Sequence, residues 1–278
     1  MYELRHQLHS HRFTIQTEDE ELAELCSQLY PNSRCEGNDG SVDIVYALEE
    51  GKSSNGDRLY EVFENGVKKC EKDRKSKLFS RLEWMITCNA LSHLQEFFQL
   101  HAGAVVKDGK AILLPAEHGR GKTTLTTNLI HNGYHCLADD IVLLEPNTLS
   151  LYSFPRCFMV KGDGIKLLNK INVKENSYGY YCDYRDILYL DPATVNGSLV
   201  AKAEPFAIID LTYDRNSESE LKRLSMSKTC MVLLERSMNI DKYKRKGVAA
   251  LTGLARRSKC YSLTINNIQD AVKLLSHI

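Results

Sequence analysis

Alternating apolar and polar residues mark the N-terminal third of the chain. Residues 12–16 alternate with the period of a strand, and residues 42–48 form a second run of the same kind. Between these two runs, apolar residues recur at helical spacing over residues 17–30. We expect a helix there, and either Thr17 or Asp19 can cap its first turn.

A hairpin and a long helix are predicted next. Residues 59–63 and 67–70 read as two strands, joined by an Asn-Gly pair at 65–66 that readily adopts the positive φ angles of a tight turn. Apolar residues at helical spacing then extend over residues 75–100, which predicts one long helix. Together these elements predict a small α+β module over residues 1–97.

The hydrophobic pattern changes after this helix. Nearly continuous apolar runs replace the alternation, which is typical of buried strands. Strands are predicted over residues 101–106, 111–115, 135–138, 141–144, 149–154, 187–190, 206–213 and 260–265. Helices are predicted over residues 123–132, 226–236, 243–255 and 267–278, the last of them capped by Asn266 or Asn267. We therefore expect residues 98–278 to form one α/β domain.

Composition excludes some classes of partner. The 278 residues include 36 Lys plus Arg and 36 Asp plus Glu, so no net field attracts the chain to nucleic acid or to a membrane. No apolar run approaches the roughly 18 residues that a membrane-spanning helix needs. Nine cysteines occur without any Cys-x-x-Cys spacing, and the first residues are too polar for a secretory signal. We therefore expect free thiols in a cytoplasmic protein.

Residues 116–123 match a phosphate-binding loop of the Walker A type. An apolar strand precedes the loop and a helix follows it, so backbone N–H groups and the positive end of the helix can converge on phosphate oxygens. Lys122 is expected to reach the β- and γ-phosphates, and the Thr123 hydroxyl to bind Mg²⁺. The strict pattern has glycine where this chain has Ala116, which is a small departure. The predicted nucleotide-binding residues are Glu117, His118, Gly119, Arg120, Gly121, Lys122, Thr123 and Thr124.

Two adjacent carboxylates follow the next apolar strand. Asp139 and Asp140 stand at its end, where a carboxylate commonly holds the metal of a phosphate-loop enzyme. Two carboxylates allow a division of labour, in which one binds Mg²⁺ and the other accepts the proton of an attacking hydroxyl. The sequence therefore indicates phosphoryl transfer, with Mg²⁺ held by Thr123 and one of the two carboxylates.

In their order along the chain, these features resemble the HPr kinase/phosphorylase superfamily. The shared features are a strand that begins at His101, a glycine turn at Gly109, the phosphate loop, a helix that ends at Gly133, and Ala-Asp-Asp at 138–140. The resemblance covers about residues 98–160. It implies an ATP site in a mixed-sheet kinase core related to phosphoenolpyruvate carboxykinase. It also implies that His101 lies by the γ-phosphate, that Asp139 is the general base and that Asp140 is its metal-facing partner, and it leaves an exchange of these two roles open.

The chain departs from HPr kinase itself in two respects. Thr123-Thr124 stands where that enzyme has Ser-Glu, and the Arg-Gly-rich signature of that enzyme is absent from the sequence. The chain is therefore similar to shorter relatives, some of which phosphorylate serine on modified peptides such as lasso peptides, and others free serine. An arginine is expected to neutralise the transferred phosphoryl group. The first candidate is Arg156, followed by Arg120, Arg185 and Arg256.

Three functions are compatible with these residues. The first is an ATP- and Mg²⁺-dependent kinase that phosphorylates a hydroxyl, with serine of a peptide or small protein as the expected acceptor. The second is a kinase for a small molecule, such as free serine or a sugar. The third is a regulatory module that binds ATP without catalysis. The sequence leaves open the preference for ATP over GTP, a reverse phosphorylase activity and the oligomeric state, a homo-oligomer included.

Overall fold

The computed structural model describes residues 1–30, 33–35, 42–117, 119, 121–161, 163–168, 179–182, 186–195 and 198–278. The chain divides into two compact units. The first unit comprises Met1–Gln95 together with Pro155–Lys161 and Gly179–Asp191. The second unit contains Glu96–Phe154 and Pro192–Ile278, together with helix α4 (Asp163–Leu168).

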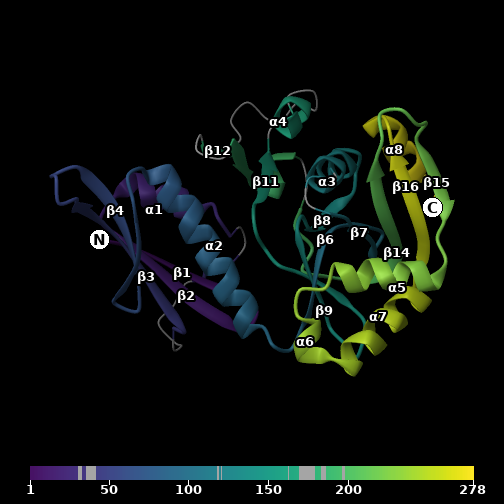
Figure 1. Ribbon diagram of the computed structural model, residues 1–278, viewed down its shortest axis with the longest axis horizontal. Helices are drawn as coiled ribbons and strands as arrows, with labels where there is room; N and C mark the ends of the chain where they lie inside the picture. The colour runs from purple at the N-terminus through teal and green to yellow at the C-terminus, as the bar shows by residue number, and fades with distance from the viewer. Residues whose placement is uncertain are drawn as a thin grey trace. The chain divides into compact units, whose positions relative to one another are not determined.

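The first unit is built on a five-stranded sheet with the order β1-β2-β3-β4-β5. Its strands are β1 (Tyr2–Leu8), β2 (His11–Thr17), β3 (Ile44–Lys52), β4 (Arg58–Glu64) and β5 (Val67–Lys72). Only β2 and β3 are parallel, and α1 (Glu20–Ser27) lies in the connection between them. Helix α1 packs on β1 and β2, helix α2 (Lys75–His93) packs on β4 and β5, and the two helices contact each other, so both cover the same face (Figure 1).

Local sequence signals set the turns and the helix start in this unit. The β4–β5 hairpin turns at Asn65 and Gly66, whose φ angles are 49° and 77°, as an Asn-Gly turn requires. Of the two expected caps of α1, the structure uses Asp19, whose carboxylate accepts a hydrogen bond from the Leu22 N–H at 3.0 Å.

The long helix predicted over residues 75–100 is too long at its C-terminal end. Helix α2 ends at His93, and Leu94 leaves the helical region with φ −74° and ψ 64°. Strand β6 (Phe98–Lys107) then begins, and its residues pair with three other strands. The apolar residues of 97–100 fitted a helical spacing, but the inter-strand hydrogen bonds that fix them as strand come from distant segments.

Two segments expected in the second domain belong to the first unit instead. Strands β11 (Phe158–Lys161), β12 (Gly179–Cys182) and β13 (Ile187–Leu190) form a three-stranded sheet with β13 in the middle. This sheet packs on α2, where the ring of Tyr189 meets Phe79 edge-on at 5.1 Å between centroids. Burial of these apolar rings against α2 explains why the two segments leave the domain in which the sequence places them.

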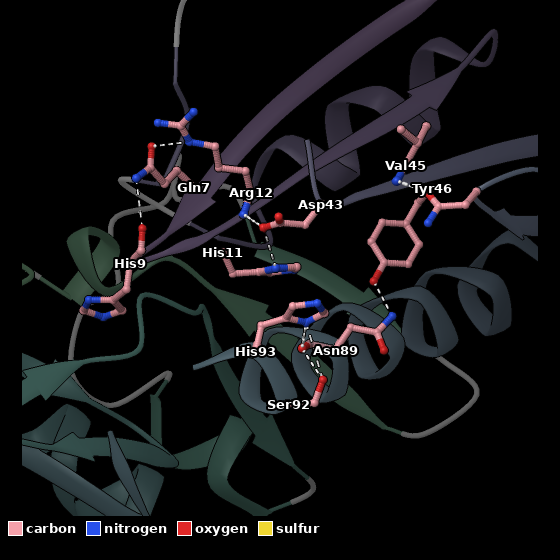
Figure 2. Close-up of polar contacts among 11 residues, drawn as sticks. Gln7, His9, His11, Arg12, Asp43, Val45, Tyr46, Asn89, Ser92 and His93 are labelled. Atoms are coloured by element: carbon pink, nitrogen blue, oxygen red, sulfur yellow. Dashed lines mark hydrogen bonds and ion pairs between the residues drawn. The ribbon is translucent and has the colours of Figure 1, made fainter. Parts of the chain in front are cut away.

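Polar groups are buried in the core of the first unit. His6 is fully buried, stacks on Phe13 at 5.0 Å between ring centroids, and lies with Nδ1 2.8 Å from the Ser33 hydroxyl. His11 is also buried, between the Asp43 carboxylate at 3.2 Å and the ring of His93 at 4.6 Å (Figure 2). Burial, and then the charge of Arg34, lower the pKa of His6 to about 4.

We expect the free energy of unfolding to fall as the pH is lowered from about 6.5 to about 4. Over this range the unfolded chain binds a proton at His6 that the folded protein does not bind, because folding lowers the pKa of His6 from 6.5 to about 4. The protonation of His6 in the unfolded chain lowers the free energy of unfolding by about 3 kcal/mol over this range. The pKa of His11 is lowered by burial and then by His93, so His11 acts in the same direction.

Urea unfolding at several pH values, followed through the fluorescence of the single tryptophan, measures this loss. The control is His6→Gln, which keeps a hydrogen-bonding group near Ser33 but does not titrate. Carboxylates titrate alike in both proteins, so the difference between their unfolding free energies isolates His6. That difference is expected to shrink by about 3 kcal/mol between neutral pH and pH 4, and an unchanged difference would contradict the prediction.

The second unit contains a mixed eight-stranded sheet among the described residues, with the order β10-β9-β6-β7-β14-β16-β15 and with β8 paired beside β9 on β6. Its strands are β6, β7 (Lys110–Pro115), β8 (His135–Ala138), β9 (Ile141–Leu144), β10 (Leu151–Ser153), β14 (Lys202–Tyr213), β15 (Glu220–Arg223) and β16 (Lys259–Ile265). The pairs β7–β14 and β14–β16 are parallel and the others antiparallel. Strand β10 also pairs with the start of β14, so the sheet curls back on itself.

Helices cover this sheet in two pairs. Helix α3 (Lys122–His131) packs against α8 (Ile268–Ser276), and α5 (Met226–Glu235) packs against α7 (Arg245–Arg257), with the short α6 (Ile240–Tyr243) beside α7 (Figure 1). Of the two caps expected for the last helix, the structure uses Asn267, whose side chain accepts from the Gln269 N–H at 2.8 Å. A short 3-10 helix (Pro192–Val195) completes the unit.

Two observations bear on the expectations from composition. Within the described ranges, none of the helices has both the length and the apolar character needed to cross a bilayer. The nine cysteines all lie in the part of the chain that the structure describes, and all are free thiols.

Candidate functional site

The predicted phosphate-binding loop lies between β7 and α3 in the second unit. Gly119 and Gly121 have φ angles of 78° and 81°, in the left-handed region that glycine adopts without strain. A Cβ at either position would meet nothing within 4 Å, so the need for glycine is conformational rather than a matter of space. Helix α3 begins at Lys122 directly after the loop, which directs its positive end at the loop. His118 and Arg120 lie outside the described residues.

The Lys122 side chain is buried and folds back over the loop that precedes it. Only 4% of the side chain is exposed, and its ammonium group donates to the carbonyl oxygens of Ala116 at 3.0 Å and Glu117 at 3.3 Å. The same ammonium group lies 3.2 Å from Nε2 of His101 and 3.8 Å from the Asp140 carboxylate. Several oxygen acceptors therefore hold the Lys122 ammonium group beside the residues of the loop.

The two predicted carboxylates face different partners. The Thr123 hydroxyl donates to Oδ2 of Asp139 at 3.2 Å, and Asp139 is only 9% exposed. Oδ1 of Asp140 lies 2.8 Å from Nε2 of His101, and 31% of the Asp140 side chain is exposed. The structure thus pairs Asp139 with the predicted metal-binding hydroxyl, and Asp140 with the histidine. Nε2 of His101 can donate to Asp140 or accept from Lys122, so these three groups share one hydrogen-bond network.

Strand pairing holds the two carboxylates opposite His101. Strand β6 pairs with β9 over its first half and with β8 over its second half, so the Asp139-Asp140 turn lies beside the middle of β6. The Ala102 N–H donates to the Asp140 carbonyl at 3.1 Å. At Gly103 a Cβ would approach Thr126 Oγ1 to 2.9 Å and the Asp139 carbonyl to 3.2 Å. The absent side chain at Gly103 therefore lets α3 and the Asp139 backbone approach the strand closely.

These donors suit Mg²⁺ bound together with a nucleotide. Mg²⁺ prefers oxygen ligands and is usually held by one or two carboxylates, with phosphate oxygens and water completing its shell. The Thr123 hydroxyl and the Asp139 and Asp140 carboxylates provide such oxygens beside the loop. Among the described residues, no three His, Cys, Asp or Glu side chains gather into a site that could hold a metal ion.

Arg236 also lies at this site, although no pattern in the sequence predicts it there. Its side chain lies 3.3 Å from Glu117 of the phosphate loop through Nη2, and its carbonyl accepts from the His101 N–H at 2.7 Å. Its Nε is buried and has no hydrogen-bond partner among the described residues. Arg236 lies 119 positions beyond Glu117, in no recognisable motif, so only the folded chain brings it here.

A third carboxylate experiences the field of this arginine. Burial raises the pKa of Asp210 on β14, and the positive charge of Arg236 opposes that effect. The negative charges of Glu235 and Glu117 add to the rise. One arginine therefore lies among three acidic side chains at this edge of the site.

The other predicted residues that the structure describes lie outside this cluster of side chains or only at its edge. Thr124 lies in the first turn of α3, where its carbonyl accepts from Asn128 Nδ2 at 2.8 Å. Arg156 belongs to the first unit, where its Nε lies 3.0 Å from the Glu83 carboxylate. Arg256 is exposed in the last turn of α7, and Arg185 lies outside the described residues. The structure therefore brings together His101, Lys122, Thr123, Asp139 and Asp140 and adds Arg236, whereas Arg156 is paired with a buried carboxylate.

Comparisons with known proteins add little to this geometry. No protein-family model matches the chain, and no curated protein matches its sequence. Among solved structures, the chain is similar to the Hpr(Ser) kinase/phosphatase from Coxiella burnetii, with a TM-score of 0.32 and 13% sequence identity. The similarity covers 64% of this chain and 94% of that one. A TM-score of this size does not establish a shared fold, so any inference about function has to come from the residues of the site.

Proposed function

We propose that the protein is an ATP- and Mg²⁺-dependent kinase that transfers the γ-phosphate to a hydroxyl group, with serine of a peptide or small protein as the acceptor. The observation that carries the proposal is the division of the two carboxylates beside the phosphate loop. Asp139 faces the Thr123 hydroxyl, and Asp140 faces His101 and Lys122. A site that only binds a nucleotide needs one such carboxylate for its metal, whereas a kinase has a use for both.

The geometry favours a definite role for each carboxylate. Asp139, which is nearly buried beside Thr123, is the proposed metal ligand, and the bound Mg²⁺ would neutralise charge on the phosphates. Asp140, the more exposed of the two, is the proposed base that accepts the proton of the attacking hydroxyl. The resemblance to HPr kinase implies the opposite assignment but leaves an exchange of the two roles open. Exposure supports the exchange, because a base must reach a hydroxyl that enters from solvent.

Three further side chains support this chemistry. His101 orients the Asp140 carboxylate through the 2.8 Å contact of its Nε2. Lys122 is positioned to exchange its carbonyl acceptors for phosphate oxygens. Arg236 lies beside Glu117 of the loop, and we propose that it neutralises charge on the transferred phosphoryl group in place of Arg156.

Transfer of label from γ-labelled ATP to an acceptor tests the function. The acceptors are serine-containing peptides, free serine and simple sugars, each with Mg²⁺ and with a chelator in its place. Labelled peptide that disappears with the chelator is the expected result. Label on free serine or a sugar alone would make the protein a small-molecule kinase. Tight ATP binding with no labelled acceptor in any arm would identify a non-catalytic nucleotide-binding module and overturn the proposal.

A further inference from the structure

A surface cavity of about 590 Å³ lies in the first unit, between the edge strand β5 and helix α2. Lys72 from β5 and Arg81 and Trp84 from α2 are among its lining residues. None of the residues of the phosphate-loop site lines it. A volume of this size is typical of pockets that bind ligands.

The charges around this cavity are unequally paired. Its two acidic side chains already have cationic partners: Asp73 pairs with Lys77 at 2.8 Å, and Glu71 pairs at 2.6 Å with Lys68, which it shares with Glu61. Lys72 and Arg81 have no carboxylate partner among the described residues, although both line the cavity. The cavity therefore offers two cations to an incoming anionic group.

An aromatic ring lies beside these cations. Trp84 is 49% exposed, and the Arg81 guanidinium lies 4.3 Å from the centroid of its ring. Burial of an exposed indole is among the larger gains that an interface can make. A ligand with an anionic group and an apolar group would therefore use both features of the cavity.

The strand that borders the cavity has an open edge. Strand β5 is the last strand of its sheet and pairs only with β4 among the described strands. All of its side chains are exposed or half-buried, with Val67 59% exposed. An extended peptide can add to such an edge through main-chain hydrogen bonds, and side-chain pockets beside the edge then give specificity.

We propose that this cavity and the edge of β5 bind an extended, acidic segment of a peptide that also carries an apolar side chain. The carboxylates of the segment pair with Lys72 and Arg81, its apolar side chain packs on Trp84, and its main chain adds to β5. This inference deepens the proposed function and rests on it in one respect, the identification of the bound peptide as the acceptor. The segment would then lie outside the phosphorylated residue and select the acceptor by its acidic character.

The single tryptophan of the chain lies in this cavity, so its fluorescence reports binding directly. The full-length protein is titrated, without ATP, with a peptide of alternating Glu and Val that contains no hydroxyl residue. We expect a saturable change in fluorescence. The same peptide with Gln in place of Glu, or with N-methyl groups along one edge, is expected to bind about tenfold more weakly or worse.

Variants of the protein provide the second half of the test. Lys72→Gln combined with Arg81→Gln is expected to weaken binding of the fluorescently labelled peptide by about tenfold, as measured by anisotropy. Lys69→Gln is the matched control, because Lys69 lies on the same strand but pairs with Glu64 and does not line the cavity. Equal affinity of the double variant and the wild type would overturn the proposal. So would saturation of the fluorescence change by inorganic phosphate or free glutamate at the same concentration as the peptide.

The binding experiment and the kinase assay can fail independently of each other. Binding is measured without nucleotide, so a protein that binds the acidic peptide but phosphorylates nothing would retain this inference and lose the kinase. A protein that phosphorylates serine peptides of any charge equally well, and whose Trp84 does not respond, would retain the kinase and lose this inference.

Discussion

Asp140→Asn is expected to lower the rate of phosphoryl transfer by about 10²- to 10⁴-fold while ATP binding persists. Asparagine keeps the size of the side chain and its contact with His101, but it cannot accept the proton of the attacking hydroxyl. Because Asp139 and Thr123 remain, the Mg²⁺ concentration for half-maximal activity should stay close to that of the wild type. Initial rates with labelled ATP, measured over a range of Mg²⁺ concentrations, give both the transfer rate and the Mg²⁺ requirement.

Asp139→Asn is the variant to compare with Asp140→Asn, because it removes the other carboxylate. Loss of the metal-facing carboxylate should raise the Mg²⁺ requirement, and excess Mg²⁺ should restore part of the rate. The matched control is Asp241→Asn, because Asp241 is an exposed carboxylate in the first turn of α6. This variant should leave both the transfer rate and the Mg²⁺ requirement unchanged. If Asp140→Asn raises the Mg²⁺ requirement and Asp139→Asn does not, the roles are those implied by the resemblance. If neither variant changes the rate, neither carboxylate takes part in transfer.

Arg156→Met is expected to destabilise the protein by about 3–5 kcal/mol, because it leaves Glu83 as a buried charge without its counterion. The Arg156 and Glu83 side chains are 9% and 6% exposed, and their charged atoms lie 3.0 Å apart. Thr87 donates to the same carboxylate at 3.0 Å, and a hydroxyl cannot compensate a full charge. Urea unfolding followed by Trp84 fluorescence measures the loss, since Trp84 and Glu83 are neighbours on α2.

The double variant Glu83→Gln/Arg156→Met separates a structural from a catalytic role of this arginine. Removing both charges should recover most of the lost stability, because no unpaired charge remains. Arg58→Met, which breaks an exposed pair with Glu50, is the control and should leave the free energy of unfolding close to that of the wild type. If Arg156→Met is as stable as the wild type but transfers no phosphate, the catalytic role expected from the sequence is the correct one.

Local features of the sequence correctly predicted much of the secondary structure around the candidate site. The glycine positions, the helix that starts at Lys122 and the turn that carries Asp139 and Asp140 all lie within one strand-loop-helix-strand segment. Each of these features depends on residues close to one another in the chain, such as a glycine at positive φ or an apolar run bounded by a turn. The hairpin at Asn65 was predictable for the same reason, and for each of the two helix caps the sequence offered two neighbouring candidates, of which the structure uses Asp19 and Asn267.

Other features were not predictable from the sequence. Strand β1 was not predicted, although its residues alternate, with Leu4, His6 and Leu8 buried and paired with the neighbouring strand β2. Strands β11, β12 and β15 are short segments without a clear alternation, and their partner strands fix them. Strand pairing can impose an extended conformation on a segment whose own pattern is weak, because the hydrogen bonds of the partner strand outweigh local propensity. The C-terminal end of α2 was missed for a related reason, since the apolar spacing of a helix continued into a buried strand.

By itself, the sequence determined the local order of a strand, a glycine-containing loop, a helix and a turn with two carboxylates, and it predicted that this loop binds phosphate. Only the tertiary structure decided which side chains meet there. It placed Asp139 against Thr123, Asp140 against His101, Arg236 against the loop, and Arg156 against Glu83. Motifs depend on residues that are neighbours in the chain. Ion pairs instead join charges that folding brings together from distant positions, because a charge that is buried away from water needs a partner.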